Sequence, residues 1–361
     1  PDHLIRGLIF YLIFCLKNGR IQSMNLEKLY KILEDQPKYR VQQAKDAIFK
    51  KLSSNWSEAS NLSKDLKDKL NKECPLEIDG QIFASRDTKT TKALITLTDG
   101  LQIETVMLSH KDGRHTVCVS TQVGCPLACT FCATGKLGLK RNLEIEEMLE
   151  QVLFFSRMLK EEDKRVSNVV FMGMGEPFLN YDNVLKAISY LNQDLVIGAR
   201  HISISTSGVI DGIEKLANEK MQINLAISLH APNEKLRTEL MPINKRFPLA
   251  DLLKAVDKYI TKTGRRVMFE YLMIKGVNDS PAQAKQLVGL MKKPLYMVNL
   301  IAYNPTDVFQ ASEKRSIENF RAILEQEGVA VTQRYSFGQD IDAACGQLAN
   351  KNLPRGKAGK K

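Results

Sequence analysis

Short apolar runs alternate with longer amphipathic segments from about residue 115 to residue 336. The apolar runs have the length of strands and lie at residues 116–120, 167–173, 201–207, 223–229, 266–274, 296–303 and 329–336. The segments between them repeat apolar residues at helical spacing and lie at residues 143–160, 183–192, 210–219, 249–264, 281–293 and 316–328. This alternation predicts a parallel sheet, either open or closed into a barrel. Six repeats are fewer than the eight of a full TIM barrel, so the repeats predict an α/β fold whose sheet is either open or closed in part, as in a partial (β/α)6 TIM-like barrel.

The part of the chain that precedes this core has a different pattern. Segments 25–33, 40–52 and 60–73 carry apolar residues at helical spacing, and Ser60 or Asn61 is the expected cap of the third. They predict a small, basic helical module, which also holds the tryptophan. A plain helical spacer and an RNA-binding accessory domain both fit these residues.

Residues 81–107 read as strands. Two alternating runs flank Asp99–Gly100, a dipeptide that is typical of a β-hairpin turn. We therefore divide the chain into a helical accessory domain at 24–80, a hairpin segment at 81–110, a core at 111–349 and a basic tail at 350–361. Solvation and RNA binding are both open explanations for the charge of the tail.

The first residues need a separate interpretation. Residues 8–16 are uninterrupted apolar, which is too short for a membrane span of about 20 residues. No small-residue cleavage site of a signal peptide follows them. We interpret residues 1–23 as an upstream extension, with Met24 as the true start, and expect a cytoplasmic protein without a membrane segment.

Composition and charge narrow the class of partner. The chain has 361 residues, 43% of them hydrophobic and 26% charged, which suits about two globular domains. Its net charge of +11 favours a polyanionic partner such as nucleic acid, although solubility alone explains such a charge equally well. The seven cysteines are odd in number and four of them fall between residues 118 and 132. This pattern indicates metal or redox chemistry in a reducing compartment rather than secreted disulfides.

The strongest chemical signal is the phrase GCPLACTFCATG, which follows the first core strand. It places Cys125, Cys129 and Cys132 at C-x3-C-x2-C spacing. Thiolates are soft ligands that suit zinc or an iron–sulfur cluster. A structural zinc site needs a fourth ligand, and His115 lies on the far side of the strand. Three cysteines leave one iron of a four-iron cluster open to a small molecule, with a closed metal knuckle as the alternative.

This spacing resembles the signature of radical S-adenosylmethionine enzymes. The resemblance implies a [4Fe–4S] cluster held by Cys125, Cys129 and Cys132, whose open iron chelates S-adenosylmethionine. It implies that one electron from the cluster cleaves the sulfonium to a 5′-deoxyadenosyl radical. The usual fold is a full or partial β/α barrel, in agreement with the repeats.

Polar or glycine-rich phrases end four of the core strands, at residues 173–177, 205–208, 228–230 and 303–305. Ligand sites of parallel β/α folds gather at the carboxyl ends of strands, and glycine lets the backbone approach a ligand. Each phrase alone is more often a turn. Together they make candidate S-adenosylmethionine contacts, with Glu176 for the α-amino group: Gly175, Glu176, Ser207, Ser228, Leu229, His230 and Asn304.

Two further cysteines lie at opposite ends of the core. Cys118 is inside the first strand and Cys345 follows the last one. A lone strand cysteine is more often a small core residue than a reactive thiol. The ends of a barrel's strand series are neighbours in space, however, and a thiol pair beside a radical source permits covalent chemistry with disulfide release.

The ordered motifs resemble one group of this superfamily over residues 24–349. They are GCPLACTFCATG, GMGEP with Asn180 three positions on, SISTSG, SLHAPN, LMPIN, GVND, YNP and DIDAACGQL. The group methylates carbon 2 of an adenine in the peptidyl-transferase centre of 23S rRNA. Some members also methylate the adenine 3′ to the anticodon of tRNA.

The resemblance implies a mechanism with two S-adenosylmethionine molecules per turnover. The first methylates Cys345, and the radical from the second takes a hydrogen from that methyl group. The methylene adds to adenine carbon 2, Cys118 takes the proton, and a Cys118–Cys345 disulfide forms as the product leaves. Glu104 aligns with a glutamate that the family uses as proton acceptor, although a strand glutamate is by chemistry more often a solvated residue.

Two alternatives and several partners accompany this interpretation. A neighbouring subgroup methylates carbon 8 of the same adenine, but its glycine phrase usually lacks the proline found here at Pro177. A basic RNA-binding protein with a structural metal is the alternative from another functional class. The resemblance implies 23S rRNA and tRNA as partners, an electron donor such as flavodoxin or ferredoxin, and a monomer.

Overall fold

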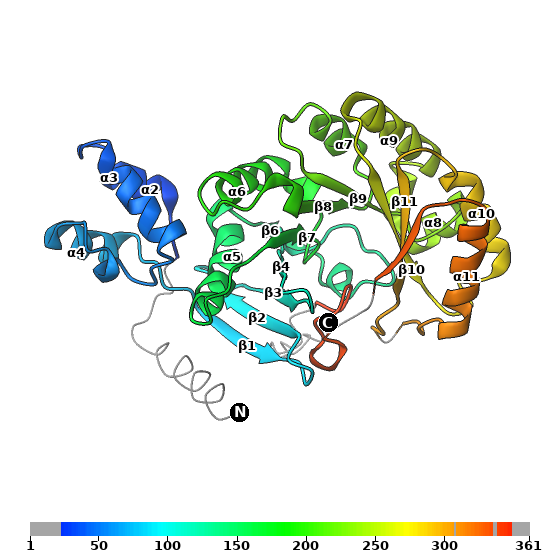
Figure 1. Cartoon of the computed structure of the whole chain (residues 1–361), viewed down its shortest axis with the longest axis horizontal. Coiled ribbons are helices and arrows are strands. Elements are labelled where there is room, and N and C mark those ends of the chain that lie inside the picture. The colour runs from blue at the N-terminus through cyan, green and yellow to red at the C-terminus, as the bar shows by residue number, and fades with distance from the viewer. Residues whose placement is uncertain (1–22, 307, 335–337, 349–361) are drawn as a thin grey trace, which may run out of the picture.

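A ten-stranded sheet forms the body of the protein in the computed structural model, which describes residues 23–306, 308–334 and 338–348 (Figure 1). The strands in spatial order are β1 (Gly80–Ala84), β2 (Thr90–Thr96), β3 (Gln102–Ser109), β4 (His115–Cys118), β7 (Asn168–Phe171), β8 (Ile202–Thr206), β9 (Asn224–Ser228), β10 (Val267–Met273), β11 (Tyr296–Ala302) and β12 (Val331–Arg334). From β4 to β12 every neighbouring pair is parallel.

Helices cover the outer face of this curved sheet (Figure 1). They are α5 (Ile145–Lys160), α6 (Tyr181–Gln193), α7 (Ile210–Leu216), α9 (Leu249–Thr263), α10 (Pro281–Met291) and α11 (Lys314–Gln326). Helix α8 (Glu234–Leu240) lies instead at the carboxyl ends of β8 and β9, which its Arg237 contacts. The predicted strand–helix repeats are confirmed, and so is the α/β class. Across the described residues the strand order has two free ends, β1 and β12, so the barrel is partial, as predicted.

The predicted hairpin is confirmed and proves to belong to the same sheet. Strands β2 and β3 pair antiparallel around Gly100, whose φ of 79° suits glycine. Strand β3 then pairs antiparallel with β4, which places Val106 opposite Cys118. Strand β1 falls within the segment that the sequence predicts to form strands, although its irregular burial pattern does not mark a separate alternating run.

A small hairpin brackets the cysteine loop. The sequence did not predict this hairpin. It consists of β5 (Gln122–Gly124) and β6 (Leu139–Asn142), which pair antiparallel with an irregularity between Val123 and Gly124. Both strands are too short to show a reliable alternating pattern.

The N-terminal helices α2 (Leu26–Ile32), α3 (Tyr39–Lys45) and α4 (Lys64–Glu73) form a separate group beside α5 (Figure 1). The prediction of Ser60 or Asn61 as a cap is wrong, because α4 begins after Ser63 and the preceding residues form a turn from Ala59 to Leu62. The group also contains the π-helical turn η1 (Asp46–Lys50) and the 3-10 turn η2 (Trp56–Glu58).

The centre of this group is built around the tryptophan. Trp56 is fully buried, and its Nε1 donates to the backbone oxygen of Cys74 at 2.7 Å. The Cys74 thiol in turn donates to the backbone oxygen of Asn25 at 3.2 Å. Cys74 is therefore a core residue that ties α4 to α2.

Carboxylates of α5 fasten the N-terminal group to the sheet domain. The backbone N–H of Met24 donates to Glu150 at 2.7 Å and that of Leu26 donates to Glu146 at 2.9 Å. Burial raises the pKa of Glu150 from its usual 4.5 to about 8. The N-terminal helices are therefore attached to α5 of the sheet domain by hydrogen bonds, one of which is accepted by the buried carboxylate of Glu150.

The predicted upstream extension, the basic tail and Cys15 lie outside the described residues, apart from Ser23. No helix within the described ranges is long and apolar enough to cross a membrane.

Candidate active site

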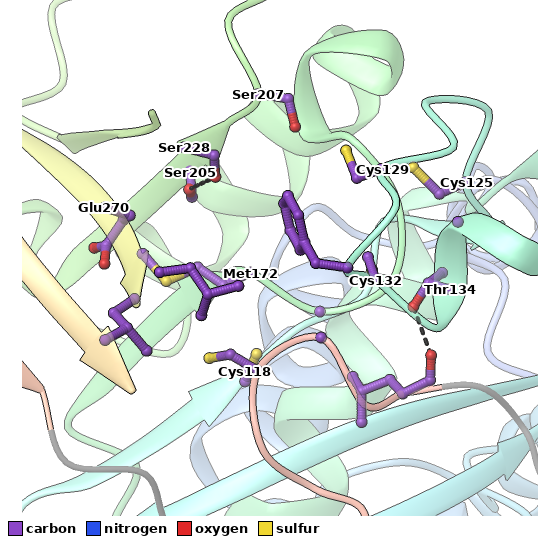
Figure 2. A pocket seen from close by; sticks show the side chains of 18 of the residues that line it. Cys118, Cys125, Cys129, Cys132, Thr134, Met172, Ser205, Ser207, Ser228 and Glu270 are labelled. Atoms are coloured by element: carbon purple, nitrogen blue, oxygen red, sulfur yellow. Dashed lines mark hydrogen bonds between the residues drawn. The ribbon is translucent and has the colours of Figure 1, made fainter. Parts of the chain in front are cut away.

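One cavity at the carboxyl ends of the parallel strands collects most of the candidate site residues (Figure 2). The candidates that line it are Cys118, Cys125, Cys129, Cys132, Gly175, Glu176, Ser207, Ser228, His230 and Cys345. Leu229, Asn304 and Glu104 do not line it. The gathering of strand-end residues follows from the parallel topology, since all of these strands end on the same side of the sheet.

The cysteine loop is clamped on both sides. Gly124 has a φ of 79°, and a Cβ there would collide with the backbone oxygen of Gly138. This close approach lets the N–H of Cys125 donate to that oxygen at 3.1 Å. Farther along, the N–H of Thr130 donates to the backbone oxygen of Leu240 at 3.0 Å. The three thiols are thereby held against the cavity (Figure 2).

The donor set fits an iron–sulfur cluster better than a single ion. Among the described residues, no three His, Cys, Asp or Glu side chains are arranged to hold one metal ion. A cubane asks for a different arrangement, because each cysteine binds its own iron. Burial raises the pKa of Cys125 to about 12 and also raises that of Cys129. These thiols therefore need the positive charge of bound iron to ionise.

Gly175 and Glu176 form a cradle beside the cysteine loop. The φ of Gly175 is 100°, and a Cβ there would lie 2.6 Å from the Cβ of Gln122. Glu176 is buried, and its two carboxylate oxygens accept the backbone N–H of Ser207 at 2.7 Å and that of Phe178 at 3.1 Å. The side chains of Thr206 and Ser207 also hydrogen-bond to this carboxylate, and burial raises its pKa. A cation such as an α-ammonium group beside it would favour the charged form.

The ends of β8 and β9 contribute hydroxyl groups. Ser205 and Ser228 approach to 3.4 Å between their hydroxyl oxygens (Figure 2), and Ser207 lines the same cavity as Cys129. The buried guanidinium of Arg237 holds these ends together, donating to the backbone oxygens of Ser207 at 2.7 Å and Ser228 at 3.3 Å. The strand ends are therefore fixed before any ligand binds.

His230 presents a neutral ring to the cavity. Its Nδ1 accepts the backbone N–H of Leu272 at 3.1 Å, so the ring proton is on Nε2. Burial, with the nearby Arg237 charge, lowers its pKa to about 3. The ring of Phe131 meets it edge-on, with 4.9 Å between centroids. His230 is thus a fixed donor rather than an acid.

Cys345 reaches the cavity on a loop that rests on the cysteine loop. The N–H of Ala133 donates to the backbone oxygen of Gly346 at 2.8 Å, and the Thr134 hydroxyl donates to that of Leu348 at 2.6 Å (Figure 2). Cys118 lines the same cavity from β4. Burial, followed by the charge of Cys345, raises the pKa of Cys118 to about 12. The two thiols therefore lie close enough for their charges to interact.

Three candidates have structural contacts instead of a place in the lining. Glu104 is buried, and its carboxylate pairs with Lys92 at 2.9 Å. Leu229 is fully buried and donates its N–H to the backbone oxygen of Glu270 at 3.0 Å. Asn304 donates to the backbone oxygen of Cys345 at 3.2 Å, so it supports that loop.

The cavity also contains residues that the sequence did not single out. They include Phe131, Met172, Glu270 and Arg334. Met172 lies directly before the glycine-rich phrase, which is a signal that strand-end reasoning could have used. Glu270 and Arg334 are isolated polar residues within strands, and no local pattern marks them.

Comparisons with known proteins agree with this site. The Radical SAM superfamily profile matches residues 119–288. A probable dual-specificity RNA methyltransferase RlmN from Dictyoglomus turgidum is 46% identical over 336 residues, covering 91% of this chain and 96% of the relative. One of the same name from Bacillus cereus is 44% identical over 343 residues, covering 93% and 94%.

A solved structure extends the likeness to the whole fold. A radical SAM methyltransferase from Sphaerobacter thermophilus superposes with a TM-score of 0.86 at 41% identity, covering 92% of this chain and 99% of that one. With relatives this similar over nearly their full length, the chain belongs to the RlmN family of radical S-adenosylmethionine RNA methyltransferases.

Proposed function

We propose that the protein methylates carbon 2 of an adenine in the peptidyl-transferase centre of 23S rRNA, and carbon 2 of the adenine 3′ to the anticodon of tRNA. One observation carries the proposal: Cys118 and Cys345, from opposite ends of the core, line the same cavity as Cys125, Cys129 and Cys132. A metal-binding protein without chemistry has no need of this second pair.

Cys125, Cys129 and Cys132 are the residues that would hold the [4Fe–4S] cluster of the family. When bound, the cluster and S-adenosylmethionine supply a methyl group and, after one-electron cleavage of a second molecule, a hydrogen-abstracting carbon radical. Glu176 is placed to take the α-ammonium group of S-adenosylmethionine in the cradle of Gly175. Ser207, Ser228 and His230 are placed for its ribose and carboxylate.

Cys345 is the proposed methyl carrier. Carbon 2 of adenine is not nucleophilic, so a direct displacement cannot methylate it. The thiolate of Cys345 instead takes the methyl group from the first S-adenosylmethionine and releases S-adenosylhomocysteine. After loss of one hydrogen atom, the methylene on Cys345 bonds to adenine carbon 2 and joins RNA to protein.

Cys118 is the proposed resolving residue. Its thiolate takes the proton from carbon 2 of the radical adduct, and loss of one electron, for which the oxidised cluster would be the acceptor, restores the aromatic ring. After Cys118 has lost that proton again, its sulfur bonds to the sulfur of Cys345 as the bond between Cys345 sulfur and the methylene breaks. The methylene carbon keeps the bonding pair and takes a proton to become the methyl group. A thiol reductant of the cell must reduce the disulfide before the next turnover. Glu104, paired with Lys92, has no proton-transfer role in this proposal.

The partners follow from this chemistry. Each turnover consumes electrons, for which we propose a flavodoxin- or ferredoxin-like donor. The net charge of +11 suits contact with RNA phosphates, and we propose that a monomer binds them. Reduced thiols and an RNA substrate suit the cytoplasm.

An isotope experiment tests the position of the methyl group. Anaerobically reconstituted protein is given reductant, S-adenosylmethionine and rRNA fragments whose adenine carries deuterium at carbon 2 or at carbon 8. We expect deuterium loss only from the carbon-2 label, together with 5′-deoxyadenosine.

The other outcomes separate the alternatives. Loss of label from carbon 8 would replace the proposal by the carbon-8 reaction of the resistance subgroup. Zinc in place of iron, with no 5′-deoxyadenosine, would leave only an RNA-binding protein with a structural metal.

A further inference from the structure

The last parallel strand brings a cation to the thiol pair. Arg334 ends β12, where the sheet register sets it beside Ile301 of β11, and both residues line the cavity. Cys118 lines the same cavity from β4, at the opposite end of the parallel series. The curvature of the sheet therefore brings its first and last parallel strands to one site (Figure 1).

The surroundings of Arg334 consist of sulfur and one carboxylate. Its Nη1 donates to the Met172 sulfur at 3.7 Å. Three groups that line the cavity raise its pKa against the effect of burial: Cys345 most strongly, then Glu270 and Cys118. His110, on the side of β3, feels the Arg334 charge as well. Within the described part of the chain, these are the titratable groups whose charges interact with Arg334.

Glu270 is held in its own place on β10. Asn299 donates from Nδ2 to the Glu270 carboxylate at 2.8 Å, and burial raises the pKa of this carboxyl. Its attraction to Arg334 is coulombic. An arginine keeps its charge under almost all conditions, so the positive charge at this point of the cavity is permanent.

We propose that Arg334 is a positioning residue that stabilises the thiolate forms of Cys345 and Cys118, and that Glu270 moderates this effect by competing for the same charge. The inference rests on the proposed function, in which both thiolates act as nucleophiles. A thiolate in a buried cavity is unfavourable without a cation, and a nearby arginine is a recognised way to lower a cysteine's pKa.

Thiol alkylation tests the proposal independently of methyl transfer. The reduced, anaerobic holoenzyme without RNA is treated with iodoacetamide across a pH series. The rates at Cys118 and Cys345 are then measured peptide by peptide by mass spectrometry, on the unmethylated fraction of Cys345. We expect R334Q to slow alkylation of Cys345 roughly ten-fold near neutral pH, because the thiolate is the reactive form. R334K should retain most of the rate.

Two further variants separate electrostatics from damage to the fold. E270Q removes the competing negative charge and should speed alkylation of Cys345, the opposite direction to R334Q. If R334Q does not fold, the neutral double variant R334M/E270Q removes both charges and should still show the slow reaction. Disruption of packing would not move the two single variants in opposite directions.

Arg266 offers a matched control. It also donates to a methionine sulfur, that of Met297 at 3.8 Å, but it does not line the cavity. R266Q should leave both alkylation rates unchanged. Equal rates in R334Q and the parent protein would overturn the proposal. If R334Q then also weakened RNA binding and reduced its salt dependence, Arg334 would be a phosphate contact instead. If the alkylation rates of R334Q and E270Q changed as expected but no methylated RNA was formed, this inference would stand and the proposed function would fail.

Discussion

The side-chain amide of Asn304 donates a hydrogen bond to the backbone oxygen of Cys345 at 3.2 Å. The other end of the amide is also occupied, since Gln339 donates to Asn304 Oδ1 at 2.8 Å. Asn304 is nearly fully buried, so these contacts are shielded from water. The end of β11 therefore fixes the loop that carries the proposed methyl-bearing sulfur.

N304A should uncouple Cys345 from the cluster. Loss of the contact leaves a buried carbonyl without its partner, which costs about 1–3 kcal/mol and loosens the loop. We expect a normal iron content but at least a ten-fold lower rate of Cys345 methylation, measured by mass spectrometry of the peptide. N192A removes a similar contact, to the backbone oxygen of Ile197, away from the cavity and should methylate normally. Equal rates in both variants would refute a supporting role for Asn304.

C118A should stop the reaction after RNA has become attached. Without the resolving thiol, neither proton removal nor disulfide formation proceeds, so RNA stays bonded through Cys345. Denaturing gels with labelled RNA should show a covalent complex in C118A, and C118A/C345A should show none. The buried Cys74, outside the cavity, provides the control C74S. Free methylated RNA from C118A at the normal rate would eliminate the proposed role.

The Glu104–Lys92 pair should act on stability. Both side chains are buried and 2.9 Å apart, and removing one partner of such a pair typically costs about 3–5 kcal/mol. E104A should therefore lower the denaturant midpoint markedly, whereas K92M/E104L, which replaces the pair by apolar groups, should recover most of the loss. Urea unfolding followed by circular dichroism measures both. A stable but inactive E104A would restore Glu104 as a proton acceptor.

Glu150 should make stability depend on pH. Its pKa rises from about 4.5 in the unfolded chain to about 8 in the folded protein, so the folded state holds the proton more tightly. Stability should consequently be greatest below pH 4.5 as far as this group is concerned and should fall as pH rises toward 8. E150Q keeps an acceptor for the N–H of Met24 and should flatten this trend. Parallel urea midpoints of the two proteins between pH 5 and pH 8 would contradict the raised pKa.

Periodicity and strand-end phrases predicted the parts of the molecule that local sequence determines. The helices and parallel strands of the core follow from their apolar spacing, and Glu176 or Ser207 could be assigned because parallel strands end at one edge. Partners across strands could not be assigned in this way. Lys92 meets Glu104 only because β2 and β3 pair with Leu94 opposite Glu104, which makes the two charges diagonal neighbours.

The same limit applies to Arg334. Whether a single polar residue in a strand points into the cavity or away from it depends on the register of β12 against β11, which the sequence of β12 does not reveal. Asn304 illustrates a related limit. Its position at a strand end was predicted, but its contact with the distant loop of Cys345 is not marked by any nearby residue in the sequence.

The contacts of Ala133 and Thr134 with Gly346 and Leu348 have a consequence for synthesis on the ribosome. A nascent chain that has emerged only as far as β11 already contains the proposed iron ligands but lacks the wall formed by residues 344–348. That segment must therefore emerge before the cavity can close, and copies truncated ahead of it would leave the cluster site open to oxygen and would lack Cys345.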